Sequence, residues 1–234
     1  MFGDSKKLSK INQMIINHPL VKGELKELKP RIFGVSIKDD YDRSMLFCRY
    51  QEFYESPFKE IRGKYFSLEK LMRVYKTHWK KDTFTYPIDW TGYNIPSNVL
   101  NKAISVFGLP ANEYDIIIRE IIDFCRKKYP DDLWYLIGAD GFTSKTMDHE
   151  IAHALYYTNS SYKKDVTRLI KNIKLEHYEK LRKKLVKMGY VDNKKIIDDE
   201  IQAFMSTGLY NGLDTKELKK YEQLFIDNFK KYTK

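Results

Sequence analysis

Five consecutive residues, His149 to His153, constrain this chain more than any other feature of its sequence. They read His-Glu-Ile-Ala-His and fall within residues 146–157, which the apolar periodicity predicts to be a helix. At 100° per residue, His149 and His153 are about 40° apart around the axis and one turn apart along it, so both imidazoles project from one face. Ile151 and Leu155 lie on the opposite side and are suited to a core. This division of faces is expected of a helix that lies beneath a cleft.

The spacing of the two histidines also has a chemical meaning. Two imidazole nitrogens on one helical face can bind a single Zn²⁺ at about 2.0–2.1 Å. Glu150 lies about 100° from His149, beside the metal face. From there its carboxylate can contact a water molecule at the metal and take its proton. The alternative is a helix with two structural histidines and a surface glutamate.

A zinc site of this kind needs a third protein ligand. In metzincins a glycine and a histidine follow the second motif histidine at the third and sixth positions, but this chain has Tyr156 and Asn159 there. The metzincin subclass is therefore excluded. The remaining common solution is a glutamate from a later helix.

Residues 194–208 supply three candidates for that ligand, namely Asp198, Asp199 and Glu200. On a helical wheel Glu200 falls within the apolar arc, whereas Asp198 lies at its edge and Asp199 outside it. An ionised carboxylate on a buried face is costly unless it is paired or bound to a metal. Glu200 is therefore the expected ligand and Asp199 is not. The alternative for Glu200 is a buried salt bridge to a lysine or arginine.

The combination of His149, Glu150, His153 and a later Glu200 resembles the gluzincin type of zincin metallopeptidase. The sequence Asp-Glu-Ile-Gln-Ala-Phe at residues 199–204 also resembles the ligand helix of lethal-factor-type toxin peptidases. The resemblance covers about residues 133–210. It implies one Zn²⁺ per chain, held by the two histidines and Glu200, with Glu150 as the general base and a peptide or protein as the substrate.

The same resemblance implies a side chain that stabilises the oxyanion of the reaction. Tyr190 and Tyr210 lie ten residues before and ten residues after Glu200, on expected loops, and are the candidates. A purely structural role for each tyrosine is the alternative. His177 falls in the apolar stripe of its helix and is expected to be a packed histidine.

We expect an α+β, zincin-like fold with a small N-terminal sheet and a mostly helical C-terminal part. Residues 1–145 would form an N-terminal α+β subdomain, and residues 146–234 a helical subdomain with the metal ligands, the two making one compact catalytic unit. The apolar run 133–139 is expected to be an edge strand beside the motif helix, where a substrate could bind in extended form by β-addition. The other expected elements are a strand at 31–38, a helix or strand at 44–55, a loop at 84–97, and helices at 5–17, 67–79, 97–107, 112–129, 146–157, 162–188, 194–207 and 215–232.

Composition excludes several other classes of protein. Hydrophobic residues make up 42% of the 234 and charged residues 32%, which is typical of a soluble globular protein. No apolar run approaches the roughly 18–20 residues of a membrane span, and the N-terminus has no apolar segment typical of a secretion signal. Two cysteines, Cys48 and Cys125, are too few for a disulfide framework. A cytoplasmic location is expected, with export by another route left open and the oligomeric state undetermined.

The net charge of +10 supports a different hypothesis. Residues 161–234 hold 18 basic and 11 acidic residues, so +7 of the surplus lies there. The chain could therefore be a non-enzymatic basic module that binds nucleic acid or an acidic partner, although no nucleic-acid motif is present and nucleic acid is not the expected partner. A pseudo-enzyme with a structural zinc is the other alternative, but a structural site has no use for Glu150. The 13 aromatic residues between Phe47 and Tyr93, of 34 in the chain, are expected to form a core.

Overall fold

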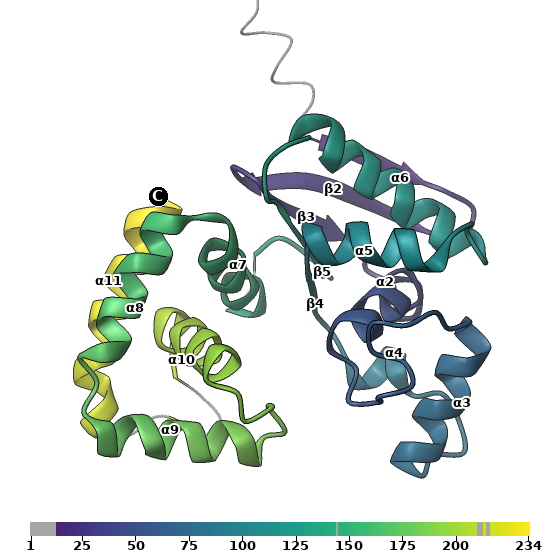
Figure 1. Cartoon of the computed structure of the whole chain (residues 1–234). Coiled ribbons are helices and arrows are strands. Elements are labelled where there is room, and N and C mark those ends of the chain that lie inside the picture. Colours follow the sequence, from purple (N-terminus) through teal and green to yellow (C-terminus); the bar gives the residue numbers. More distant parts are fainter. Residues whose placement is uncertain (1–12, 144, 210–212, 214–215) are drawn as a thin grey trace, which may run out of the picture. The chain divides into compact units, whose positions relative to one another are not determined.

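The computed structural model describes residues 13–143, 145–209, 213 and 216–234. The chain forms two compact units, Met1–Phe142 and Thr143–Lys234. The first contains a five-stranded mixed sheet with helices and the second is helical, so the expected α+β class is confirmed (Figure 1). Among the described residues, no helix is both long and apolar enough to cross a membrane.

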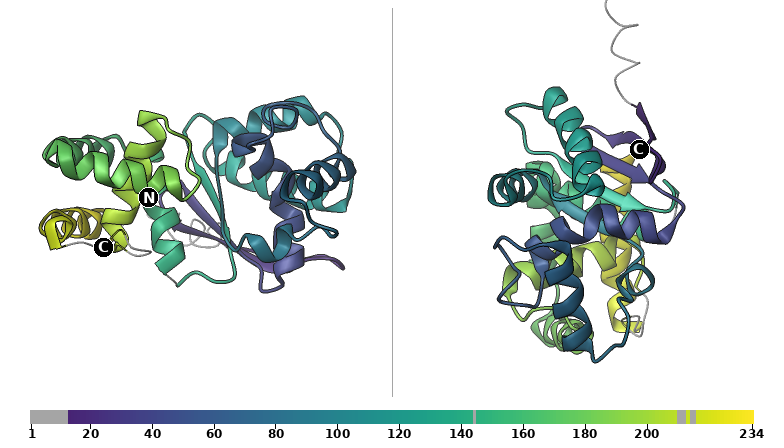
Figure 2. Two further views of the ribbon diagram at one scale, coloured as in Figure 1. Left: turned by 90° about the horizontal axis from the view of Figure 1, so that it is seen from below. Right: turned by 90° about the vertical axis from the view of Figure 1, so that its right-hand side faces the viewer.

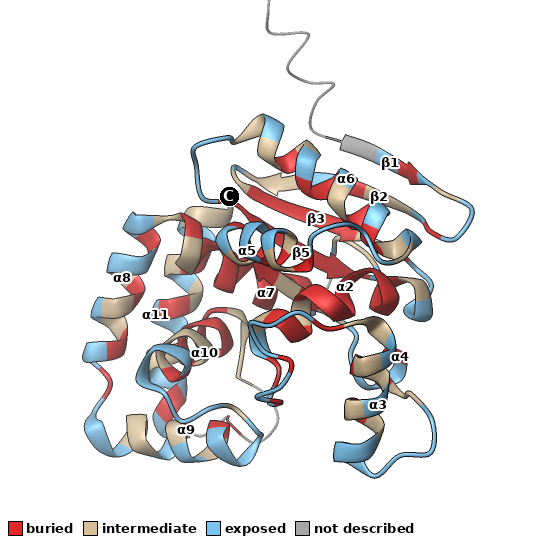
Figure 3. Cartoon of the chain, turned by 45° about the vertical axis from the view of Figure 1, so that its right-hand side comes forward, coloured by how far each residue is buried: buried red, intermediate tan, exposed pale blue. Residues whose placement is uncertain are grey.

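The sheet of the first unit has the strand order β1-β2-β3-β5-β4. Its strands are β1 (Gln13–Asn17), β2 (Lys22–Lys29), β3 (Ile32–Ser36), β4 (Tyr93–Pro96) and β5 (Tyr135–Ala139). Neighbouring strands are antiparallel except β3 and β5, which are parallel with Gly34 opposite Ile137. Every residue of β5 is buried, and strands flank it on both sides (Figure 3).

The expectation of an edge strand at residues 133–139 is wrong. β5 pairs with β3 on one side and with β4 on the other, so its backbone groups are used in the sheet and cannot add a substrate strand. The segment 84–97, expected as a loop, contains both α4 (Tyr86–Asp89) and β4. β4 occupies the edge instead, and Pro96 fits there because an edge strand tolerates a residue without an N–H.

The prediction of a helix at residues 5–17 is also wrong for those of its residues that the structure describes. Residues 13–17 form β1, and residues 5–12 lie outside the described part of the chain. Ile16 is buried whereas Ile15 is 66% exposed, which is the alternation of a strand with one covered face. Pairing with β2, the next strand of a hairpin, therefore decides this segment.

Three helices cover one face of the sheet: α2 (Asp40–Glu55), α5 (Ser97–Phe107) and α6 (Glu113–Lys128) (Figure 2). The ring of Phe47 on α2 lies against Gly138, where a Cβ atom would come within 2.5 Å of it. Phe33 of β3 meets Phe124 of α6 edge to face at 6.5 Å between ring centroids. The ambiguous segment 44–55 is thus helical, and much of the aromatic cluster is core, as expected.

A buried ion pair joins α2 to α6. Arg49 binds Asp115 through Nη1, donates from Nη2 to the carbonyl oxygen of Phe66 at 2.7 Å, and lies 4.2 Å from the ring centroid of Phe107. Asp115 also accepts a hydrogen bond from the backbone N–H of Ala111 at 2.9 Å. The two charges are therefore compensated inside the core.

Two serines at the starts of helices behave differently. Ser67 accepts a hydrogen bond from the backbone N–H of Lys70 at 3.2 Å and caps α3 (Leu68–Trp79). Ser97 begins α5 without capping it, because its hydroxyl instead accepts a hydrogen bond from the backbone N–H of Trp134 at 3.1 Å.

The second unit consists of five described helices: α7 (Lys145–Thr158), α8 (Ser160–Lys171), α9 (Leu175–Lys187), α10 (Lys194–Thr207) and α11 (Lys216–Thr233). The single helix expected at 162–188 is two helices, with a break at residues 172–174. α10 packs against both α7 and α11. The helix at 194–207 has the expected bounds, so Glu200 lies in its interior.

Candidate metal centre

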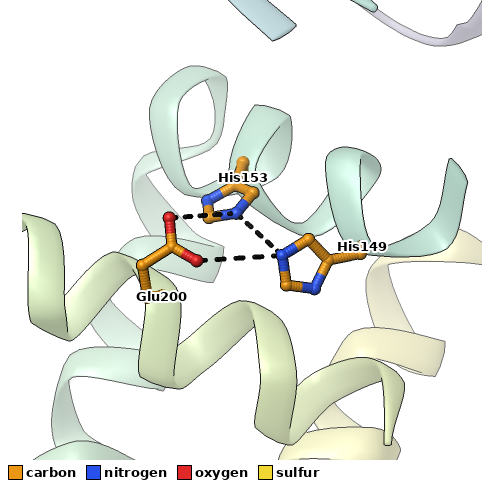
Figure 4. Close-up of side chains that lie close together, drawn as sticks. All are labelled: His149, His153 and Glu200. Atoms are coloured by element: carbon orange, nitrogen blue, oxygen red, sulfur yellow. Dashed lines mark hydrogen bonds and ion pairs between the residues drawn. The ribbon is translucent and has the colours of Figure 1, made fainter. Parts of the chain in front are cut away.

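The two histidines of α7 meet the glutamate of α10 inside the helical unit (Figure 4). Nε2 of His149 lies 3.2 Å from Nε2 of His153. Glu200 places Oε2 at 3.8 Å from the first nitrogen and Oε1 at 3.8 Å from the second. One atom from each of the three residues can be chosen so that all lie within 4.8 Å of one another. The structure thus brings together the three residues that the sequence predicts as ligands.

The separation of the two imidazole nitrogens fits a tetrahedral metal ion. Two nitrogens that each bind Zn²⁺ at about 2.0–2.1 Å at a tetrahedral angle lie about 3.3 Å apart, close to the separation seen here. Oε2 of Glu200 is buried and has no hydrogen-bond partner among the described residues. An unpaired buried carboxylate oxygen is costly, and a cation at this position would compensate it. Two imidazoles and one carboxylate are also a ligand set of catalytic zinc sites.

The surroundings of His149 favour the neutral form of its imidazole. Burial, with a smaller contribution from His153, lowers the pKa of His149 to about 3. Burial alone would lower the pKa of His153 as well, but the carboxylates of Asp199 and Glu200 outweigh it and raise that pKa well above its ordinary value. Burial raises the pKa of Glu200 to about 7. A metal ion therefore competes with a proton on His153 for this site.

The carboxylate of Asp199 binds the imidazole of His153 at the nitrogen that does not face Glu200. Nδ1 of His153 donates a hydrogen bond to Oδ1 of Asp199 at 2.9 Å. A carboxylate in this position fixes the tautomer and leaves the Nε2 lone pair free to bind a metal. The helical wheel did not predict Asp199 as a ligand, because the residue lies outside the apolar arc of its helix. From that position Asp199 reaches Nδ1 of His153, whereas its neighbour Glu200 faces Nε2 of the same ring.

Glu150 is buried next to the cluster. Its charge raises the pKa values of both His153 and Glu200, so it lies close to these groups. Asp148, by contrast, is exposed.

The structure places the candidate residues outside the motif differently with respect to the metal ligands. Tyr190, on the loop between α9 and α10, donates a hydrogen bond to Glu200, which lowers the pKa of that carboxyl against the effect of burial. Its ring lies 6.4 Å from that of Phe204. Tyr210 lies outside the described residues. His177 is half-buried, with its ring 6.0 Å from that of Tyr221 and away from the metal ligands.

Comparisons of the chain with protein-family models, with curated proteins and with solved structures found no match.

Proposed function

We propose that the chain is a zinc-dependent metallopeptidase of the gluzincin type. The observation that supports this most is the meeting of His149, His153 and Glu200 at 3.2–3.8 Å, from helices separated by two others in the sequence. Glu150 in the same motif distinguishes this set from a structural site, which needs no base.

The residues of the chain would divide the reaction as follows. When bound by the two histidines and Glu200, zinc polarises a carbonyl group and makes a water molecule more acidic. The carboxylate of Glu150 takes a proton from that water and then gives it to the nitrogen of the leaving amine. The hydroxyl of Tyr190, which forms a hydrogen bond with Glu200, would turn to donate a hydrogen bond to the oxyanion.

The state of the cysteines supports a reducing compartment such as the cytoplasm for this activity. Cys48 and Cys125 are both free and buried. Burial raises the pKa of Cys48 to about 12 and also raises that of Cys125, so neither thiol is poised for redox chemistry or metal binding.

Elemental analysis combined with a mixed peptide library tests the proposal. Purified wild-type protein should contain one zinc per chain and cleave peptides, and Glu150→Gln should keep the zinc and lose cleavage by a factor of about 10² or more. Asp148→Asn, an exposed substitution on the same helix, is the matched control and should retain both. A protein that contains no zinc after purification and reconstitution would contradict the proposal. Zinc with equal cleavage in wild type and Glu150→Gln would point to a structural metal.

A basic surface on α8 favours a second candidate function, the binding of an acidic partner. A shallow hollow of about 450 Å³ is lined by six residues of this one helix, four of them cationic. The cations are Lys163, Lys164, Arg168 and Lys171. Steeply salt-dependent binding of a polyanion, lost on replacing Lys164 and Lys171 by glutamine, would support this function.

A further inference from the structure

A buried chain of hydrogen bonds continues from Asp199 away from the metal ligands. Oδ1 of Asp199, which accepts from His153, also accepts from Nε2 of Gln202 at 3.0 Å. Oε1 of Gln202 accepts from the hydroxyl of Tyr162 at 2.8 Å, and that hydroxyl lies 3.1 Å from the hydroxyl of Ser206. Tyr162 and Gln202 are both fully buried, with none of their surface exposed.

The order of donors and acceptors in this chain is fixed. A carboxylate can only accept, so the amide of Gln202 must point its NH₂ group at Asp199 and its oxygen at Tyr162. The phenol of Tyr162 then donates to that oxygen, and the hydroxyl of Ser206 donates to the phenol. Reversing the amide would place its oxygen against the carboxylate and leave buried groups unpaired, which costs free energy.

The fixed order of these hydrogen bonds affects the metal ligand His153 through Asp199. Asp199 is one-third exposed, so without a partner inside the protein its carboxylate would exchange between His153 and water. Two donors on the same oxygen hold it in one place, and the one provided by Gln202 is itself oriented by Tyr162. With zinc bound, this arrangement keeps the proton of His153 on Nδ1 and directs the lone pair of Nε2 to the metal.

We propose that Tyr162 and Gln202 are positioning residues that set the affinity of the site for zinc by orienting Asp199 and, through it, His153. This inference rests on the proposed metal site. Neither residue touches the ligand atoms, and their effect passes entirely through Asp199. The two residues lie on α8 and α10, so the site depends on a helix that supplies no ligand.

The test measures zinc affinity by competition with a chromophoric chelator, in the full chain. Tyr162→Phe and Gln202→Met remove hydrogen bonds with little change in volume, and each should weaken zinc binding about tenfold, the lower end for partners of a metal ligand. The visible spectrum of the Co²⁺-substituted protein should change with them. Tyr232→Phe is the matched control, since its hydroxyl binds Asp165 at 2.8 Å while its ring lies 5.4 Å from that of Tyr162. It should bind zinc like the wild type.

A double-mutant cycle separates positioning from a general loss of structure. In an Asp199→Ala background, Tyr162→Phe should weaken zinc binding by less than about twofold, because its route to the metal is gone. The inference is overturned if either single variant binds zinc as tightly as the wild type, if Tyr162→Phe costs as much without Asp199 as with it, or if Tyr232→Phe weakens binding equally. Should Tyr162→Phe fail to fold by circular dichroism, Gln202→Met decides. A wild-type protein that binds no zinc overturns the proposed function itself, which is a different outcome from normal binding by all variants.

Discussion

Oε2 of Glu200 lies 3.8 Å from Nε2 of His149 and has no hydrogen-bond partner among the described residues. A carboxylate oxygen buried beside a neutral imidazole is stabilised in the presence of a cation and destabilised in its absence. The relationship makes Glu200 the residue on which the metal site depends most.

Replacing Glu200 by glutamine should therefore abolish stoichiometric zinc binding. The amide keeps the shape of the side chain but loses the charge and binds zinc poorly. Metal content after dialysis against limited zinc is the measurement. Asp198→Asn is the control on the same helix, because Asp198 binds Tyr178 and Lys194 rather than the cluster. Equal zinc content in wild type and Glu200→Gln would contradict the assignment.

Removing Asp199 should weaken the metal site without destroying it. Asp199→Asn keeps the size of the side chain but no longer holds His153 with a charge, and we expect zinc to bind about 10–100-fold more weakly. Chelator competition provides the measurement. Wild-type affinity in Asp199→Asn would show that the 2.9 Å hydrogen bond to His153 has no bearing on the metal.

Zinc should stabilise the helical unit selectively. At a free zinc concentration 100 times the dissociation constant, the added stability is about 2.7 kcal/mol. All three tryptophans, Trp79, Trp90 and Trp134, belong to the first unit, so their fluorescence reports on the sheet unit alone. We expect zinc to raise the melting transition seen by circular dichroism at 222 nm and to move the tryptophan transition less. Glu200→Gln should remove the shift, and a shift in neither probe would contradict a zinc site in α7 and α10.

The buried pair of Arg49 and Asp115 should be worth several kilocalories per mole when it is broken. Asp115→Ala leaves the guanidinium buried without its counter-ion, for which we expect a loss of about 3–5 kcal/mol in the free energy of unfolding. Asp123→Ala, on the same helix, breaks an exposed pair with Arg126 and should cost less than about 1 kcal/mol. Urea unfolding followed by tryptophan fluorescence compares the two, and similar losses would show that burial does not set the cost.

Glu52 should make the first unit less stable as the pH rises. Burial raises its pKa above the ordinary value of 4.5, and hydrogen bonds with Ser56 and Tyr86 offset only part of this effect. The folded state then holds the proton to a higher pH than the unfolded state, so stability falls from about pH 4.5 upward through the raised pKa. Glu52→Gln should remove that slope and be more stable than the wild type at pH 8.

Urea unfolding at pH 5 and pH 8 measures this dependence. Glu55→Gln is the control, because Glu55 lies at the exposed end of the same helix and should leave the slope unchanged. An identical slope in wild type and Glu52→Gln would assign the pH dependence to other groups.

The sequence alone determined the features that depend on local spacing. The four-residue interval between His149 and His153 places both imidazoles on one helical face, and the apolar arc around Glu200 singles it out from Asp198 and Asp199. Both helices have nearly the expected bounds. These features follow from helical geometry, which a sequence carries without knowledge of its partners.

The tertiary structure decided the features that depend on partners distant in the sequence. β5 is an interior strand because β4, far from it in the sequence, pairs with it. Asp199 became part of the site only when α7 packed against α10 and presented Nδ1 of His153 to it. Strand pairing and hydrogen bonds between helices depend on which surfaces meet, and no local periodicity in the chain encodes that choice.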